Sequence, residues 1–465
     1  MFTSRVAIAS ASVISLLAGC GSNVTPLADP PTPTITTAVG DPGRGWIGGE
    51  PDWVAASESD AGTKMYSGAA AGTAAPAAAV DAATPLPIVP GPPIEPSQPV
   101  PPVEQPGLRA GSVDDNADFT DFLTYLARIH DLGIATRDFD PTGRIVVTVT
   151  GTSGLPVAGA QVTVTAGGTE IARLRTTADG TARFLPALYG TTQATQATEF
   201  TFTTGDVSAT GAPGSTVALQ AAAAGGGPDP VALDVMFLLD ATGSMGDEIA
   251  RLKDTIDAVA AQVDGFESKP DVRFAMTLYR DQGDTFLTST FDFTSDVAAF
   301  RAALNDVVAD GGGDYPEALE EGLASALSEP SWRDPASTLQ LVFLVADAPP
   351  HIDRQVPLTY PAAIVDAISR GIKVFPIASS ESDDQAEAAF REIAAGTGAR
   401  FVFLSYGALG AATGESTDIA ATDYEELPLD ALVVRLIAEE LAALSGTPVE
   451  VPPTTLPPVT NPQGQ

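Results

Sequence analysis

The sequence predicts a multidomain protein. Its largest part is an α/β domain with a doubly wound, mostly parallel β-sheet, preceded by a small all-β sandwich and a disordered Pro/Ala-rich stalk. Three observations lead to this prediction. From residue 231 onward, apolar runs typical of buried strands alternate with stretches of helical periodicity. Residues 143–220 instead alternate with the period of two that strands require. Residues 21–110 contain few large apolar side chains that a core could bury.

The first twenty residues have the pattern of an export signal. Arg5 supplies a basic start, and residues 6–18 are apolar but too few to span a bilayer. The stretch ends at Cys20, the single cysteine of the chain, which follows the small residues Ala18 and Gly19. This arrangement resembles the lipobox of bacterial lipoproteins, whose cysteine is acylated after cleavage. The resemblance implies a lipid-anchored, extracytoplasmic protein of the cell envelope, on the outer membrane if the cell is Gram-negative. An ordinary cleaved signal with a chance cysteine is the alternative.

Four further segments connect or flank the predicted domains. Residues 21–110 form the stalk, where proline-rich runs favour extended polyproline-like conformations. Residues 111–142 contain one amphipathic helix, because apolar side chains such as Phe122 recur there at helical spacing. An Ala/Gly/Pro linker is expected at 221–230, and a disordered Pro-rich tail at 447–465.

Residues 143–220 predict short strands separated by turns. The stretch 145–149 alternates Ile or Val with other residues, and 178–180 reads Ala-Asp-Gly, a strong turn signal. The stretches 154–162 and 176–184 resemble those of the small carboxypeptidase-regulatory-like β-sandwich. That resemblance implies a spacer or an adhesion support rather than a site of chemistry.

Residues 231–446 predict the α/β domain. Leu233 to Leu239 is a nearly continuous apolar run, as expected for a strand buried on both faces of a parallel sheet. The apolar residues from Ile249 to Val263 then follow with helical spacing. Further strands are expected at 272–279, 339–346, 372–378 and 400–404, with a short edge strand near 286–292. Further helices are expected near 295–308, 316–328, 359–370, 384–396 and 427–444.

Polar side chains follow the predicted strands of this domain at their carboxyl ends, where open α/β sheets bind ligands. The first strand ends in Asp240, and Thr242 and Ser244 come next on a tight turn before a helix. Asp314 lies in a glycine-rich loop, and Asp347 follows a later strand. Carboxylate and hydroxyl oxygens are the ligands of a hard cation, which predicts Mg²⁺, with Mn²⁺ or Ca²⁺ as alternatives. Neutral hydroxyl ligands leave such an ion electrophilic, with a position open for a partner's carboxylate.

The spacing Asp240-x-Thr242-x-Ser244 resembles the Asp-x-Ser/Thr-x-Ser signature of the metal-ion-dependent adhesion site in von Willebrand factor type A domains. Asp347 resembles the later aspartate of that family. The resemblance implies that the Thr242 or Ser244 hydroxyl contacts the metal, with Asp240 and Asp347 acting directly or through water. The family usually places a threonine in the intervening loop; this sequence has Asp314, which we assign that role. A carboxylate there makes the site more negative and weakens binding of an acidic partner.

Other acidic and histidine residues near these strand ends receive no functional role. Asp281 and Asp284 are expected to form a solvated acidic loop, and His351 to lie on a loop surface. The chain has only two histidines and one cysteine, so a zinc site built on these residue types is nearly excluded.

The sequence predicts a binding protein rather than an enzyme. We expect a protein partner that offers an exposed acidic side chain to the bound cation. The net charge of −36 argues against nucleic acid, and membrane contact is expected through the lipid anchor alone. No phosphate-binding Gly-x-x-x-x-Gly-Lys-Ser/Thr motif is present. Two alternatives stay open: a structural envelope protein whose cation only stabilises the fold, and an envelope hydrolase.

Overall fold

The computed structural model describes residues 109–227, 230–266, 268–313, 315–379, 382–405 and 427–446. The predicted signal peptide with Cys20, the tail and nearly all of the stalk lie outside these residues, and so does Asp314. The chain divides into two units, Met1–Glu95 and Pro96–Gln465, and every described residue belongs to the second. Among the described helices, none has both the length and the apolar character that crossing a bilayer requires.

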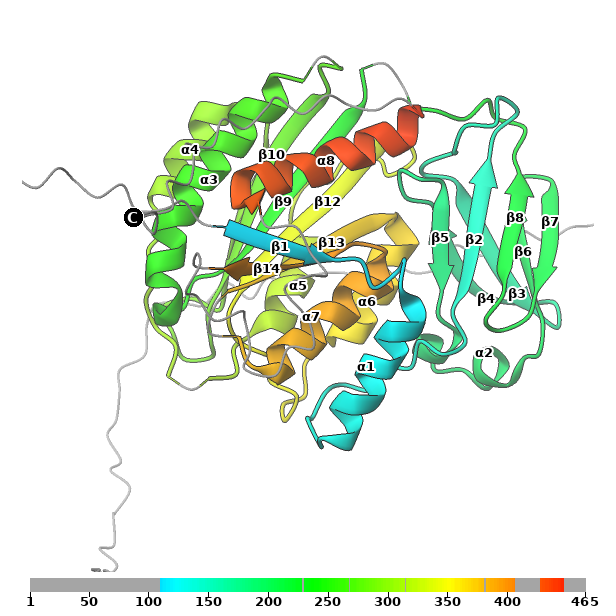
Figure 1. The fold of residues 1–465 in the computed structure, drawn as a ribbon, viewed down its shortest axis with the longest axis horizontal. Helices are drawn as coiled ribbons and strands as arrows, with labels where there is room; N and C mark the ends of the chain where they lie inside the picture. The colour runs from blue at the N-terminus through cyan, green and yellow to red at the C-terminus, as the bar shows by residue number, and fades with distance from the viewer. Residues whose placement is uncertain are drawn as a thin grey trace, which may run out of the picture. The chain divides into compact units, whose positions relative to one another are not determined.

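A mixed eight-stranded sheet is the centre of the larger domain (Figure 1). Its strands, in spatial order, are β11 (Thr288–Thr294), β10 (Asp271–Tyr279), β9 (Ala232–Asp240), β12 (Thr338–Ala346), β13 (Ile372–Ala378), β14 (Phe401–Ser405), β1 (Arg109–Val113) and β15 (Leu427–Pro428). The five strands from β10 to β14 in this order run parallel, and β11 is an antiparallel edge strand. β9 and β12 are buried along almost their whole length, as their apolar sequences require in a parallel sheet.

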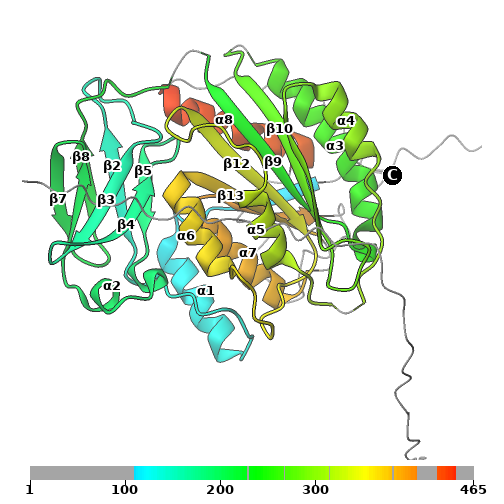
Figure 2. The same cartoon turned by 180° about the vertical axis from the view of Figure 1, so that it is seen from behind.

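Helices cover both faces of this sheet. On one face α3 (Gly246–Asp264), α4 (Val297–Asn305) and α8 (Leu429–Ser445) share a core with the strands. On the other face lie α5 (Leu319–Ser328), α6 (Tyr360–Arg370) and α7 (Asp384–Thr397). α8 stands in front of the sheet in Figure 1 and behind it in Figure 2, where α5 and α6 come forward. This is the doubly wound α/β arrangement that the sequence predicts.

Local sequence sets several helix ends within this domain. The Asp296 side chain accepts the backbone N–H groups at the start of α4, and Asp383 does the same at the start of α7. α6 ends at Gly371, whose φ of +72° is the left-handed conformation in which glycine terminates a helix at little cost. α6 and α7 therefore match the helices predicted at 359–370 and 384–396 to within one residue.

Residues 145–220 form two small sheets. One has the order β5 (Thr181–Phe184), β2 (Ile145–Thr150), β8 (Thr216–Gln220); the other has β4 (Thr169–Arg175), β3 (Gln161–Ala166), β6 (Phe200–Thr204), β7 (Val207–Gly211). A 3-10 turn, η1 (Pro186–Tyr189), and the short helix α2 (Thr192–Gln196) connect them. The Phe184 ring meets the rings of Phe200 and Phe202 edge-on, with centroids 4.9 and 5.9 Å apart. The two sheets thus share an aromatic core.

The segment before these small sheets belongs to the larger domain. α1 (Phe119–Asp131) packs on α7 through Phe122 and Tyr125, and β1 pairs antiparallel with β14. The sequence predicts the helix but places the stalk up to residue 110, inside β1. β1 is Arg-Ala-Gly-Ser-Val, which lacks a strand's apolar alternation, so its conformation depends on hydrogen bonding to β14.

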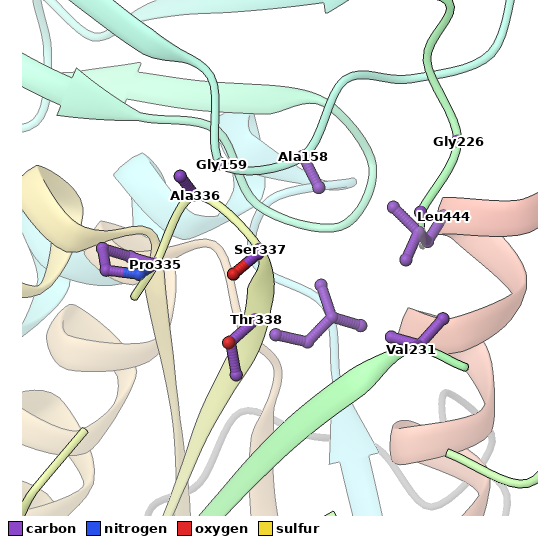
Figure 3. Close-up of a pocket in the computed structure, with 11 residues that line it drawn as sticks. Ala158, Gly159, Gly226, Val231, Pro335, Ala336, Ser337, Thr338 and Leu444 are labelled. Carbon is purple, nitrogen blue, oxygen red and sulfur yellow. The ribbon is translucent and has the colours of Figure 1, made fainter. Parts of the chain in front are cut away.

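A small junction joins the small sheets to the larger domain (Figure 3). It encloses a cavity of about 50 Å³. The lining contains no charged side chain and consists of Ala158, Gly159, Gly226, Gly227, Val231, Pro335, Ala336, Ser337, Thr338, Leu339 and Leu444. Such a lining gives close packing and no candidate chemistry.

Candidate metal centre

The turn after β9 brings three predicted site residues together. Asp240 is the last residue of β9, and its Oδ1 accepts hydrogen bonds from the Thr242 backbone N (2.9 Å) and the Thr242 Oγ1 (2.6 Å). The Oγ atoms of Thr242 and Ser244 are 3.3 Å apart. A single 3-10 turn, η2 (Gly243–Met245), then leads into α3. The alternating spacing of the sequence therefore places one carboxylate and two hydroxyls on one side of the turn.

The other carboxylate oxygen of Asp240, Oδ2, is poorly satisfied among the described residues. Asp240 is fully buried, and no donor of the described chain makes a hydrogen bond of good geometry to Oδ2, although the nearby Tyr279 hydroxyl lowers the pKa of this carboxyl. Burial, together with the nearby charge of Asp347, raises the pKa of Asp240 to about 7. Asp347 follows β12 directly and is itself buried. A buried carboxylate oxygen without a donor is costly, and a cation at this position would remove the cost.

Glu317 is a third buried carboxylate in this region. It is 4% exposed, and its Oε2 has no hydrogen-bond partner within the described part of the chain. Burial raises the pKa of Glu317 to about 9, with added effects from the charges of Asp240 and Asp281. The sequence predicts a helix from residue 316, but α5 begins at Leu319, so Glu317 lies on the loop before it. In the sequence, the position of Glu317 just after the glycine-rich loop was the one indication of a role at the site. Its burial could not be predicted, because it depends on the folded chain.

An open cavity of about 330 Å³ lies over this turn. Its lining residues are Thr242, Gly243, Ser244, Gly311, Gly312, Gly313, Tyr315, Glu317 and Ala348. The two candidate hydroxyl ligands therefore face a space that a partner's side chain can enter, whereas Asp240 lies buried behind them. This arrangement suits a binding site with one side open.

The chemistry of the side chains fits a hard divalent cation. Asp240, Thr242, Ser244 and Asp347 offer only oxygen donors, which Mg²⁺ and Ca²⁺ prefer. Asp314, the fifth predicted ligand, lies outside the described residues. Within the described ranges, no three His, Cys, Asp or Glu side chains are grouped closely enough to hold a metal. A site here therefore depends on the two hydroxyls.

The sequence-based prediction for the residues that follow β10 was wrong. Asp281 was expected in a solvated loop but is buried, and it accepts two hydrogen bonds from the Arg354 guanidinium at 2.8 and 3.1 Å. His351, expected on a loop surface, is also buried, with Nε2 3.2 Å from Asp281 Oδ1. Asp284 accepts the backbone N–H of Gly312 at 2.9 Å. The contacts of Asp281 with Arg354 join residues 73 positions apart, and the Asp284 contact joins residues 28 apart, which no local pattern reveals.

Comparison with known proteins agrees with the predicted fold. The profile of the von Willebrand factor type A domain matches residues 234–407. An ariadne-like RING finger protein of Acanthamoeba polyphaga mimivirus is 29% identical over 119 residues, 26% of this chain and 11% of that protein. Alpha-protein kinase vwkA of Dictyostelium discoideum is 32% identical over 120 residues, 26% of this chain and 19% of the kinase. This chain therefore spans only a small part of these relatives.

Two solved structures are also similar to part of the chain. Proximal thread matrix protein 1 from the mussel byssus is 16% identical, with a TM-score of 0.29, over 36% of this chain and 40% of the mussel protein. The pilus adhesin SpaC from Lactobacillus rhamnosus GG is 10% identical, with a TM-score of 0.28, over 42% of this chain and 29% of the adhesin. One structure of the mussel protein is described as having a zinc-occupied metal-ion-dependent adhesion site.

Residues 234–407 are thus a von Willebrand factor type A domain, as predicted. Domains of this family commonly bind partners through a metal-ion-dependent adhesion site. The matched span includes the candidate ligands Asp240, Thr242, Ser244 and Asp347.

Proposed function

We propose that this protein is a lipid-anchored protein of the bacterial cell envelope that binds a protein partner through a divalent cation. The cation, Mg²⁺ in the first instance, is held by Asp240, Thr242, Ser244 and Asp347, with Asp314 as a further ligand. The observation that carries this proposal is the buried Oδ2 of Asp240, which has no described hydrogen-bond partner beside two hydroxyls that line an open cavity.

The charges around the cavity support a cation. Asp240, Glu317 and Asp347 are all buried, and burial together with the neighbouring carboxylate charges raises the pKa of Asp240 and of Glu317. A divalent ion would offset that repulsion and offer a partner to the Asp240 Oδ2. The Asp240 side chain also orients Thr242, because its Oδ1 accepts both the backbone N–H and the hydroxyl of that residue.

The open side of the site indicates which kind of partner side chain binds there. A protein of net charge −36 repels an acidic partner in general, so an acidic side chain docks favourably only where a cation meets it. When bound, the ion supplies a coordination position for that carboxylate. Thr242 and Ser244, which line the cavity, leave more positive charge on the ion than carboxylate ligands would.

Binding rather than hydrolysis accounts best for the described side chains. A hydrolytic Ser244 needs a base, and the histidine within residues 234–407 is His351. Its Nε2 lies 3.2 Å from Asp281 and its Nδ1 lies 3.4 Å from Asp353, so both ring nitrogens face carboxylates. The envelope location rests on the lipobox-like sequence that ends at Cys20. Loss of lipid attachment in Cys20→Ala, measured by mass spectrometry, tests it.

Thermal unfolding of the full-length chain against Mg²⁺, Mn²⁺ and Ca²⁺ tests the site. We expect a saturable rise in Tm that disappears in Asp240→Ala and in Ser244→Ala. Asp206→Ala, which removes an exposed carboxylate from the turn between β6 and β7, is the control and keeps the rise. Equal responses in all four proteins would mean non-specific screening of an acidic chain, and the metal-site proposal would fall.

Partner capture separates adhesion from a purely structural cation. Envelope proteins retained on the immobilised full-length chain with Mg²⁺ should be lost with chelator and with Ser244→Ala. Capture that survives both treatments, together with a metal-dependent Tm, would favour the structural role instead.

A further inference from the structure

We propose that Arg137, which lies between α1 and β2 and outside the matched domain, positions the glycine loop of the candidate metal site. The inference rests on the proposed function of that site. It concerns a positioning residue, because Arg137 acts through a series of hydrogen bonds and ion pairs rather than on the ion. Each step of this series is formed by described residues.

The first step fixes a loop of the von Willebrand factor domain to Arg137. The guanidinium binds the buried carboxylate of Glu320 on α5 through Nε at 3.0 Å and Nη2 at 2.6 Å. It also donates to three backbone carbonyls, those of His351, Ile352 and Arg354, each at 3.0 Å. One side chain thus contacts three carbonyls of the turn at 351–354, with the two Nη2 hydrogens shared among Glu320 Oε2 and the carbonyls of His351 and Arg354. The planar fork of arginine suits such a set, whereas a lysine ammonium does not.

The second step passes from that turn to Asp281. The two titratable side chains of the turn that face inward both reach its carboxylate. Arg354 donates to Oδ1 and Oδ2 at 2.8 and 3.1 Å, and His351 Nε2 lies 3.2 Å from Oδ1. A bidentate pair of this kind fixes orientation as well as distance. A shift of the turn would therefore move Asp281 at the end of β10.

The third step passes from Asp281 to the glycine loop. The Asp284 Oδ2 accepts both the Asp281 backbone N at 3.1 Å and the Gly312 backbone N at 2.9 Å. A Cβ added at Gly312 would lie 2.8 Å from Glu317 Oε1 and 3.2 Å from Thr242 Cβ. Gly312 therefore lies between Glu317 and Thr242, which line the cavity, and its hydrogen bond to Asp284 fixes its position there.

The glycine loop needs such an anchor. Gly311 and Gly312 have φ values of +84° and +71°, so the loop uses conformations that glycine adopts readily but also leaves readily. Among the described residues, two hydrogen bonds hold it: Gly312 N donates to the Asp284 carboxylate, and Gly243 N donates to the Gly311 carbonyl at 3.1 Å. Of these described contacts, loss of the first leaves the one to the turn that carries the ligands.

Arg137→Lys is the informative change. Lysine keeps the positive charge beside Glu320 but cannot hold the carboxylate and three carbonyls together. The matched control is Arg175→Lys, because Arg175 likewise donates to a backbone carbonyl, that of Gly159, but within the small sheets. Asp284→Ala removes the acceptor oxygen and cuts the series at its last step.

The first readout is hydrogen exchange of the metal-free, full-length chain. We expect Arg137→Lys and Asp284→Ala to increase exchange at the amide of Gly312 at least threefold, with no increase in Arg175→Lys. Unchanged exchange at Gly312 in Arg137→Lys would overturn the positioning role, whether or not the chain binds metal. Because this measurement is made without metal, it can disprove the positioning role of Arg137 whatever the outcome for the proposed metal binding.

The second readout is the Kd for Mg²⁺ alone, measured by calorimetry. Outer-sphere changes typically cost 10–100-fold in metal affinity, so we expect about a tenfold loss in Arg137→Lys. The double variant Arg137→Lys/Asp284→Ala should bind no more weakly than Asp284→Ala, because both changes cut one series. If the losses in Mg²⁺ affinity of the two single variants multiply in the double variant, the two residues act independently and the proposed series is wrong. If the wild type binds no Mg²⁺, the proposed function fails and the exchange result alone decides the role of Arg137.

Discussion

Arg391 on α7 holds the carboxylate of Asp115 through two hydrogen bonds, Nε–Oδ2 at 3.0 Å and Nη2–Oδ1 at 2.6 Å, across 276 residues of sequence. Both side chains are buried. The same guanidinium lies 3.7 Å from the ring centroid of Tyr125 on α1. Residues that precede the matched domain therefore form part of its core packing, and the domain extends beyond the span that the family profile covers.

Asp115→Ala should destabilise the chain strongly. Among the described carboxylates, the change leaves the buried Arg391 with Glu387, whose Oε1 is 3.3 Å away. Removing one partner of a buried pair typically costs about 3–5 kcal/mol, and the remaining glutamate reduces that to about 2–3 kcal/mol. Urea unfolding measures the difference. Asp131→Ala, at the exposed end of α1, is the control and should change stability by less than about 0.5 kcal/mol. A loss as small in Asp115→Ala would show that the pair does not hold α1 in place.

The central fold could be predicted because its signals are local. The apolar run of β9 and the helical spacing of α3 lie in adjacent stretches of sequence, and each dictates its own conformation. β1 could not be predicted, because Arg109–Val113 has no pattern of its own and becomes a strand only against β14. Burial of Asp115 likewise depends on Arg391, which sequence spacing does not connect to it.

The candidate site divides in the same way. Asp240, Thr242 and Ser244 share one turn, so their spacing alone predicts that they meet. The buried states of Asp281 and Glu317 arise from loops that only the folded sheet brings together. A local pattern of acidic residues predicts solvent exposure. Asp281 is buried instead, because Arg354, a residue distant in sequence, pairs with its carboxylate.

Gly312→Ala should weaken the proposed cation binding. A Cβ at this position would lie 2.8 Å from Glu317 Oε1, and the φ of +71° adds backbone strain. The cavity must widen, so we expect Kd for Mg²⁺ to rise about tenfold, which is about 1.4 kcal/mol. Gly214→Ala is the control, because its φ is +81° but no atom lies within 4 Å of the added Cβ. An equal effect in both variants would assign the loss to strain rather than to the site.

Lys373→Met should loosen the junction between the small sheets and the larger domain. The Lys373 Nζ pairs with Glu440 Oε1 at 2.6 Å and lies 3.9 Å from Asp179 Oδ2 in the small sheets. Burial raises the pKa of Glu440 and Lys373 opposes that rise, so without the ammonium group the buried carboxyl loses its ion-pair partner, at a cost of about 3 kcal/mol. The double variant Lys373→Met/Glu440→Leu removes both charges and should regain most of that loss. Urea midpoints measure both, and a double variant as unstable as the single one would contradict a charge-based explanation.

Stability should fall as pH rises through the range set by Glu392. Burial raises the pKa of Glu392 to about 8, although the hydrogen bond donated by the Tyr360 hydroxyl opposes this. The folded pKa lies above the unfolded value of about 4.3, so the folded chain binds the proton more tightly. The contribution is complete below about pH 4 and is lost as pH approaches 8. Glu392→Gln stays neutral and still accepts the Tyr360 hydroxyl.

Glu392→Gln should therefore equal the wild type below about pH 4 and exceed it near pH 8.5 by up to about 5 kcal/mol. Urea unfolding at a series of pH values gives the difference curve, in which other groups such as Glu387, with a pKa near 7, cancel. Glu199→Gln, at an exposed position, is the control and should follow the wild type at every pH. A flat difference curve for Glu392→Gln would mean that Glu392 ionises in the folded chain without cost, which requires water or a cation beside its carboxylate.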